Sequence, residues 1–202
     1  MKNLLFILFF TPFISYCQVD SEFKLQKNFS EKDDKICITK NDCFSFSTNT
    51  DEVILTICYT NEQSGNKQTI DSMDISGIYD LTLHSFQSEK DGSSVVLLEL
   101  ETEYHPYFNA YYISKGKIVK IGEWGIAIPY IEYRCEYCGY SVEDIQINQR
   151  DGEIVFAFLK NMDFFDNSTG INNNGWVLYK AGELVLSFNI VDKSLKVIEK
   201  DR

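Results

Sequence analysis

The sequence is poor in the residues on which several common chemistries depend. Its 202 residues include only two histidines, His84 and His105. Two histidines are too few for a multi-histidine metal site, and they leave little material for histidine-based catalysis. The sequence also lacks a glycine-rich phosphate loop, a dinucleotide fingerprint and a G-x-S-x-G nucleophile elbow. We therefore expect no cofactor and no metal ion, and we favour a protein without enzymatic activity.

Basic residues and prolines are also scarce. The chain has 19 Lys and Arg residues against 30 Asp and Glu residues, a formal net charge of -11, and 3 prolines. An acidic chain is repelled by nucleic acid and by anionic lipid, so we expect neither as a partner. Hydrophobic residues (44%) and charged residues (24%) occur in the proportions of a globular protein, which excludes a chain that is disordered throughout.

The N-terminus has the pattern of an export signal. Lys2 precedes an apolar run, Leu4–Phe10, which continues with a short interruption to Ile14. The run is too short for a membrane span, which needs about 20 apolar residues. A basic start, an apolar run and a short exit segment are typical of a secretory signal. We expect residues 1–17 to be the signal peptide of a bacterial protein exported to the periplasm, the cell surface or the medium, with no transmembrane segment after signal removal.

The residues around Cys17 indicate where this signal ends. Ser15 and Cys17 place small side chains at the two positions that signal peptidase requires, so cleavage after Cys17 makes Gln18 the first residue. The alternative is a lipid anchor on Cys17, as in bacterial lipoproteins. The bulky Tyr16 stands where such proteins carry a small residue, and it disfavours the anchor.

Five cysteines remain after the signal, an odd number that requires at least one unpaired thiol or an intermolecular bond. Export favours disulfides over structural zinc. We predict a disulfide between Cys37 and Cys43, which flank the turn residues Asn41-Asp42. Cys58 lies in the apolar run 53–59, and we expect it to be a buried free thiol. The alternative is a disulfide between Cys58 and either Cys37 or Cys43.

The last two cysteines form a C-x-x-C motif. Cys135 and Cys138 can close a small loop through a second disulfide. A thioredoxin-like redox site needs a helix that lowers the pKa of the first cysteine, and the strand-like residues after Gly139 do not predict one. A four-cysteine zinc site that adds Cys37 and Cys43 is disfavoured by the long spacing of that pair and by export.

The body of the chain has the pattern of an all-β domain. No segment shows a helical period over about twelve residues, whereas short β-rich runs alternate with turn residues such as Ser64-Gly65, Lys115-Gly116 and Asp151-Gly152. We predict a single-domain antiparallel sheet meander, sandwich or barrel-like, over residues 18–202, with residues 18–35 as a loose N-terminal arm. The expected strands number about eleven: 53–59, 78–86, 94–103, 108–114, 117–122, 125–133, 142–148, 153–159, 176–180, 183–190 and 195–199.

Aromatic side chains gather between Tyr104 and Tyr140. Exposed Tyr and Trp rings give flat, amphipathic surfaces on which sugars and protein partners stack, although the same residues also fill and rim sheets. In Tyr111-Tyr112 the rings point to opposite faces of a strand, so at most one lies in the core of a two-layer fold. Together with the long loop 163–175, this region supplies the candidate binding residues: Tyr107, Tyr111, Trp124, Tyr130, Tyr137, Phe165 and Asp166.

Three glutamates, Glu99, Glu101 and Glu103, share one face of a predicted strand at intervals of about 6.6–6.8 Å. Carboxylates so placed can act as acid and base in glycoside hydrolysis, or bind calcium. We instead expect a solvated face that pairs with the lysines between residues 115 and 120. His84 is expected on the face of its own strand opposite to the leucines.

These features favour a binding or interaction module of the bacterial cell envelope, with a glycan or a protein as its ligand. Two alternatives remain. One is a small envelope hydrolase that uses the surface carboxylates, and the other is a structural subunit of an envelope assembly whose edge strands pair with partners. The burial of the three glutamates distinguishes the hydrolase from the binding module. Catalytic carboxylates would line a cleft beneath tyrosines, whereas solvated carboxylates would lie on an open face opposite lysines.

Overall fold

The structure, a computed structural model, describes residues 21–30, 35–49, 53–102, 106–127, 142–166 and 177–199. Within these ranges the chain forms fifteen β-strands and one 3-10 turn, η1 (Val142–Asp144). Each strand pairing is antiparallel, which confirms the predicted all-β antiparallel class. No helix in these ranges is long and apolar enough to cross a membrane.

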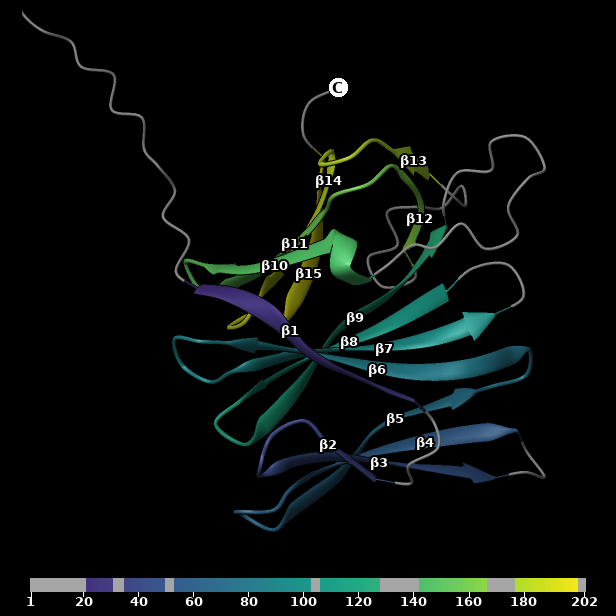
Figure 1. Cartoon of the computed structure of the whole chain (residues 1–202), viewed down its shortest axis with the longest axis vertical. Helices are drawn as coiled ribbons and strands as arrows, with labels where there is room; N and C mark the ends of the chain where they lie inside the picture. The colour runs from purple at the N-terminus through teal and green to yellow at the C-terminus, as the bar shows by residue number, and fades with distance from the viewer. Residues whose placement is uncertain are drawn as a thin grey trace, which may run out of the picture.

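Eleven of the strands form one large sheet that curls into a half-barrel (Figure 1). Their order is β13-β12-β9-β8-β7-β6-β1-β10-β11-β14-β15. Most neighbours in this order are also neighbours in sequence, as expected for a meander of hairpins. The bounds are β1 Ser21–Ser30, β6 Ile78–Ser88, β7 Ser94–Thr102, β8 Pro106–Ser114, β9 Lys117–Ala127, β10 Ile145–Arg150, β11 Glu153–Phe158, β12 Met162–Asp166, β13 Val177–Tyr179, β14 Leu184–Asn189 and β15 Ser194–Glu199.

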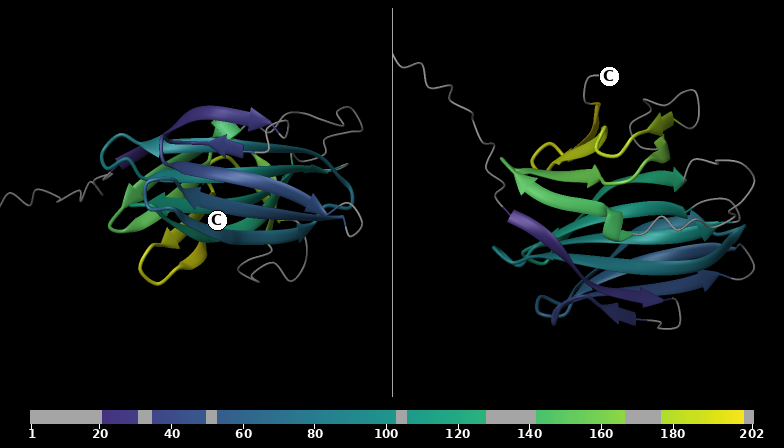
Figure 2. Two further views of the ribbon diagram at one scale, coloured as in Figure 1. Left: turned by 90° about the horizontal axis from the view of Figure 1, so that it is seen from below. Right: turned by 45° about the horizontal axis from the view of Figure 1, so that its top comes forward.

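The other four strands form a small sheet of order β2-β3-β4-β5, which covers one face of the large sheet (Figure 2). β4 shows why this sheet is amphipathic, because its buried residues alternate with partly exposed ones along the whole strand. Leu55, Ile57 and Tyr59 face inward, toward the large sheet. The bounds are β2 Lys35–Cys37, β3 Asp42–Asn49, β4 Ile54–Asn61 and β5 Asn66–Asp74.

The central strands of the large sheet bury both of their faces. On β7, Val95 and Leu97 belong to a core inside the curl, whereas Val96 and Leu98 belong to a second core between the two sheets. Each core is formed from large apolar and aromatic side chains, so each contributes hydrophobic stabilisation. The limit of one buried ring in a two-layer fold therefore does not apply to this part of the chain, because the small sheet covers the face that a two-layer fold leaves in water.

The N-terminal segment is the main correction to the predicted strands. Residues 21–30, expected within a loose arm, form β1, which lies between β6 and β10 and buries Phe23 in the core inside the curl. The prediction also missed β2, β3, β5 and β12. The two strands predicted at 117–122 and 125–133 are one continuous strand as far as Ala127.

Candidate functional site

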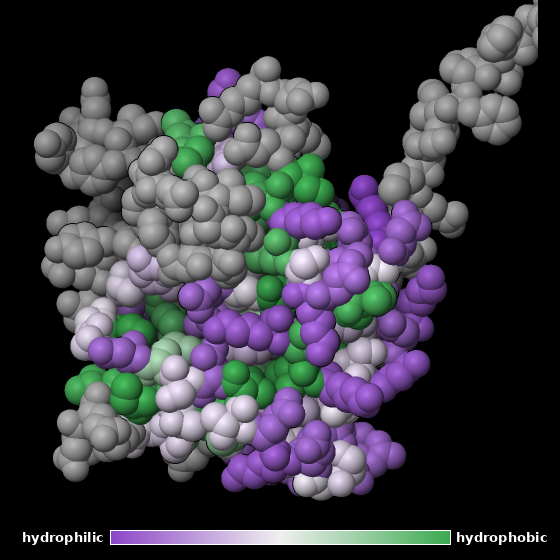
Figure 3. All heavy atoms as spheres, turned by 180° about the vertical axis from the view of Figure 1, so that it is seen from behind, coloured by the Kyte–Doolittle hydropathy of each residue, from purple (hydrophilic) through white to green (hydrophobic). Residues whose placement is uncertain are grey.

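A polar cleft lies at the end of the molecule where turns from both sheets meet. The β2–β3 and β4–β5 turns of the small sheet and the β8–β9 turn of the large sheet form its walls. Its volume is about 520 Å³, within the range of small-molecule sites. Seen from behind, the surface near this end of the small sheet is mostly hydrophilic (Figure 3). The lining residues are all polar or glycine: Asn41, Asp42, Asn61, Gln63, Ser64, Lys115 and Gly116.

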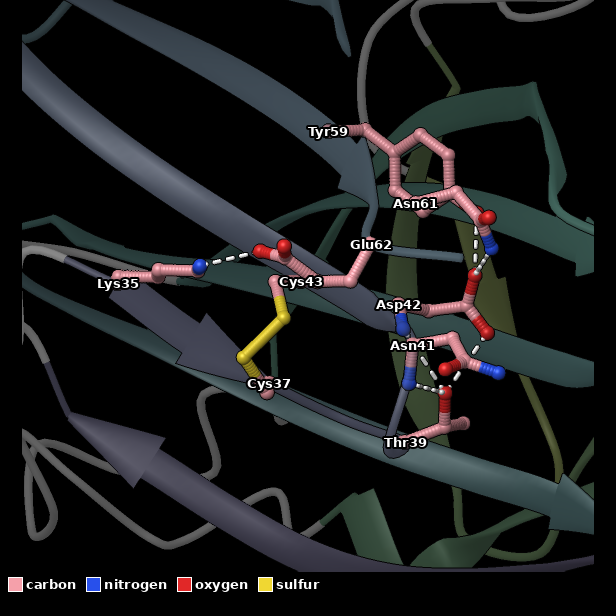
Figure 4. Close-up of a disulfide and its surroundings, with 9 residues drawn as sticks. All are labelled: Lys35, Cys37, Thr39, Asn41, Asp42, Cys43, Tyr59, Asn61 and Glu62. Atoms are coloured by element: carbon pink, nitrogen blue, oxygen red, sulfur yellow. Dashed lines mark hydrogen bonds and ion pairs between the residues drawn. A yellow bond between two sulfur atoms is a disulfide. The ribbon is translucent and has the colours of Figure 1, made fainter. Parts of the chain in front are cut away.

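The carboxylate of Asp42 is the centre of the hydrogen-bond network in this cleft (Figure 4). Its Oδ1 accepts hydrogen bonds from the Tyr59 hydroxyl at 2.5 Å and from Asn61 Nδ2 at 2.9 Å. Its Oδ2 accepts one from the Thr39 hydroxyl at 2.8 Å. Burial, and then the hydrogen bond to Asp42, raise the pKa of Tyr59 well above its ordinary value, so this residue stays a neutral donor. Three protein donors thus fix the position of the carboxylate.

The β2–β3 turn is held in place from several sides. The backbone N–H groups of Asn41 and Asp42 both donate to Thr39 Oγ1, at 3.2 Å and 2.9 Å. The N–H of Glu62 donates to the carbonyl oxygen of Asn41 at 2.7 Å, which ties this turn to the end of β4. The predicted disulfide between Cys37 and Cys43 is confirmed and joins directly paired residues of β2 and β3. The turn therefore presents Asn41 to the cleft from a fixed backbone.

Asn61 and Gly116 bring the two sheets into close contact. The side-chain oxygen of Asn61 accepts hydrogen bonds from the N–H and the hydroxyl of Ser64, both at 2.9 Å. A Cβ atom on Gly116 would lie 3.0 Å from Asn61 Nδ2, closer than about nine in ten real Cβ contacts. Gly116 also has a φ of +69°, a conformation that L side chains rarely adopt. The positive φ therefore favours glycine here, and a larger residue would also require Asn61 to move.

Some polar groups of the cleft remain available to a ligand. The amide nitrogen of Asn41 makes a long contact of 3.4 Å with the side-chain oxygen of Gln63. Among the residues that the structure describes, the side-chain oxygen of Asn41, the amide nitrogen of Gln63 and the ammonium group of Lys115 have no hydrogen-bond partner. The cleft thus offers one acceptor and two donors beside a carboxylate that is already bonded.

Two of the predicted stacking residues are buried. Trp124 is fully buried in the core inside the curl, where it packs against Phe156 with ring centroids 5.4 Å apart. Tyr111 is buried in the core between the sheets, and its hydroxyl donates to Asp71 Oδ2 at 2.9 Å. Burial, and then the charge of Asp71, raise the pKa of Tyr111 far above its ordinary value. Neither ring presents a face on which a ligand could stack, so both residues are removed from the candidate surface.

Tyr107 keeps a partly exposed side chain at the edge of the core between the sheets. Burial raises its pKa. Tyr130 and Tyr137, the side chains of Phe165 and Asp166, and the predicted pair Cys135 and Cys138 lie outside the described residues. Of the predicted aromatic residues whose side chains the structure describes, Tyr107 alone keeps part of its side chain in solvent.

The glutamate face differs from the expected solvated face. Glu99 Oε2 lies 2.5 Å from His84 Nε2, and the Glu99 side chain is only 23% exposed. His84 is on the face opposite to the leucines of β6, as predicted. Lys120, expected to pair with the glutamates, instead bonds Asp71 on the other face of the sheet. In the described part of the chain, no group of three His, Cys, Asp or Glu residues could hold a metal ion.

The residues of the cleft were recognised in the sequence as turn residues only. Asn41-Asp42, Ser64-Gly65 and Lys115-Gly116 carry clear turn signals. The fact that these turns converge depends on how the small sheet is stacked on the large one, and no local pattern contains that information.

Comparisons with known proteins give no identity. No protein family, no curated protein and no solved structure matches this chain. The functional argument therefore depends on the geometry of the cleft.

Proposed function

We propose that this protein is a non-catalytic binding module whose inter-sheet cleft takes a small hydroxyl-rich ligand, namely one or two residues of a glycan. The observation that carries the proposal is a polar cleft of about 520 Å³ in which protein contacts fix the walls but leave Asn41, Gln63 and Lys115 with free hydrogen-bonding groups. Sugar hydroxyls both donate and accept, so they complement a mixture of amide oxygen, amide nitrogen and ammonium groups.

The same geometry favours binding over hydrolysis. Glycoside hydrolysis requires two carboxyl groups that flank the scissile bond. Asp42 is the only acidic residue among the described residues that line the cleft, and three donors already bond to it. The role of this carboxylate is structural, because its hydrogen bonds orient the side chains of Asn61 and Thr39.

The proposal places the protein outside the cytoplasm, as a component of the cell envelope or the medium. The export pattern of residues 1–17 supports this location. The disulfide between Cys37 and Cys43 fits an oxidising compartment, although by itself it is weaker support than the export pattern.

The test is a binding titration of the chain that begins at Gln18. Calorimetry with cello-, xylo-, manno-, galacto- and chito-oligosaccharides and with oligogalacturonate should find at least one ligand. The Asn41→Ala/Gln63→Ala double variant should weaken that affinity about tenfold, because each substitution removes a hydrogen bond made by an exposed side chain. Gln146→Ala, at an exposed position of β10, is the matched control and should bind as the parent does. No binding by any probe, or equal binding by the double variant, would contradict the proposal.

A further inference from the structure

Charge is distributed unevenly around the cleft. The three segments that build it, residues 35–42, 61–67 and 114–117, contain five lysines and two acidic residues. The whole chain has a formal net charge of -11. The segments around the cleft are therefore locally basic on an acidic protein, while the lining itself carries one lysine, Lys115, and one aspartate, Asp42.

Existing contacts already engage both acidic groups of these segments. Glu62 forms an ion pair with Lys35 (Figure 4). Asp42 accepts hydrogen bonds from three uncharged donors and makes no ion pair with a described residue. Neither acidic group is paired with Lys115.

The remaining lysines of these segments have no such partner. Among the described residues, Lys24, Lys35, Lys120 and Lys160 each form an ion pair. In that same part of the chain, Lys40, Lys67, Lys115 and Lys117 form none. Lys115 is the one lysine that lines the cleft, next to the free groups of Asn41 and Gln63.

We propose that the glycan bound in the cleft is acidic, with the carboxylate of a uronic acid residue paired with Lys115. This inference rests on the proposed function and names the substrate class of the same site. The hydroxyls of the uronic acid bond to Asn41 and Gln63, while Lys40 and Lys117 strengthen the positive potential at the rim. The negative charge of the rest of the protein repels long polyanions, so the preferred ligand is a short acidic oligosaccharide.

The experiment compares two probes with the same sugar backbone, one with charged carboxylates and one with neutral methyl esters. Trigalacturonic acid and its trimethyl ester are titrated into the chain that begins at Gln18, at about 20 mM and about 0.5 M NaCl. We expect the acid to bind about five- to tenfold more tightly than the ester at low salt, and we expect this advantage to shrink at high salt, where the charges are screened.

Variants assign the effect to one side chain. Lys115→Gln should remove the preference for the acid, and Lys115→Arg should keep it. Lys180→Gln, which removes an exposed lysine at the end of β13, should leave it unchanged. Equal affinity for acid and ester, or a preference that Lys115→Gln does not alter, would overturn the inference while leaving the glycan-binding proposal intact. Failure of both probes to bind would also overturn it, and the neutral oligosaccharides would then test the glycan-binding proposal separately.

Discussion

Tyr111 and Tyr112 are consecutive residues of β8, and their side chains are buried in two different cores. Tyr111 points into the space between the sheets, where its hydroxyl bonds to Asp71 of β5. Tyr112 points into the curl of the large sheet. β8 therefore belongs to both packing layers, and the hydrogen bond of Tyr111 links the large sheet directly to the small one.

The contribution of this hydrogen bond to the stability of the protein can be measured. Tyr111→Phe should lower the free energy of unfolding by about 1–2 kcal/mol, because it removes a buried hydrogen bond to a charged acceptor without leaving a cavity. Tyr112→Phe is the control on the other face of the same strand, and we expect a loss below about 0.5 kcal/mol. Urea denaturation measures both. Equal losses for the two variants would show that the bond to Asp71 adds nothing.

The pair of His84 and Glu99 should be strongly coupled. Both side chains lie on one face of adjacent strands, with a contact of 2.5 Å and little exposure. A double-mutant cycle with His84→Ala and Glu99→Ala should give an interaction free energy of about 1–3 kcal/mol, because each single change leaves the other polar group partly buried without this partner. Glu101→Ala, two residues along the same face of β7, should cost less than about 0.5 kcal/mol. A coupling near zero would contradict the prediction.

The disulfide should stabilise the fold, whereas the thiol of Cys58 should not. Replacing Cys37 and Cys43 by serine opens a short loop and should cost about 2–3 kcal/mol. For a chain of this size the midpoint of thermal unfolding should fall by about 5–10 °C. Cys58 is a free thiol, as predicted, but the prediction that it is buried is wrong, because it lies on the partly exposed face of β4. Cys58→Ser should therefore change the midpoint by less than about 2 °C.

Alkylation tests the same assignment chemically. Iodoacetamide should label Cys58 in the folded, non-reduced protein, and it should label Cys37 and Cys43 only after reduction. Peptide mapping by mass spectrometry identifies which cysteines carry the label. Label on Cys37 without reduction, accompanied by protection of Cys58, would mean that Cys58 has captured Cys43.

Glycine at position 116 should matter for the cleft as well as for the turn. Gly116→Ala combines a strained positive φ with a close contact to Asn61. Gly92→Ala is the matched control, because Gly92 has a φ of +70° and open space where its Cβ would lie. The control should cost about 1 kcal/mol from backbone strain alone. Gly116→Ala should cost clearly more and should weaken oligosaccharide binding, and equal losses in thermal unfolding would show that the contact with Asn61 is easily relieved.

Local patterns predicted the parts of the fold that are local. The turn residues Lys115-Gly116 and Asp151-Gly152 lie in hairpins between paired strands, as predicted. β1 was missed because its partners are distant in sequence, with Phe23 opposite both Ser88 and Ile147. A polar strand that is completed only by such distant neighbours carries no signal that distinguishes it from a loose arm.

The candidate site could not be predicted from the sequence for a related reason. Strand parity correctly placed Tyr111 and Tyr112 on opposite faces, but it could not show that a second sheet covers the face of Tyr111. Aromatic content therefore pointed to residues such as Tyr111 and Trp124, which are buried in cores. The polar residues of the cleft come together only through stacking of the two sheets, which depends on many weak contacts of the core and on no single motif.

The place of β1 has a consequence for how the chain is made. In the sheet order, β1 is the strand that joins β6 to β10, so the two halves of the half-barrel share a hydrogen-bonded sheet only through it. An early segment of the chain is therefore paired with residues translated more than a hundred positions later. Until β10 has been synthesised, the backbone groups on that side of β1 have no strand partner, so we expect the large sheet to be completed late in folding.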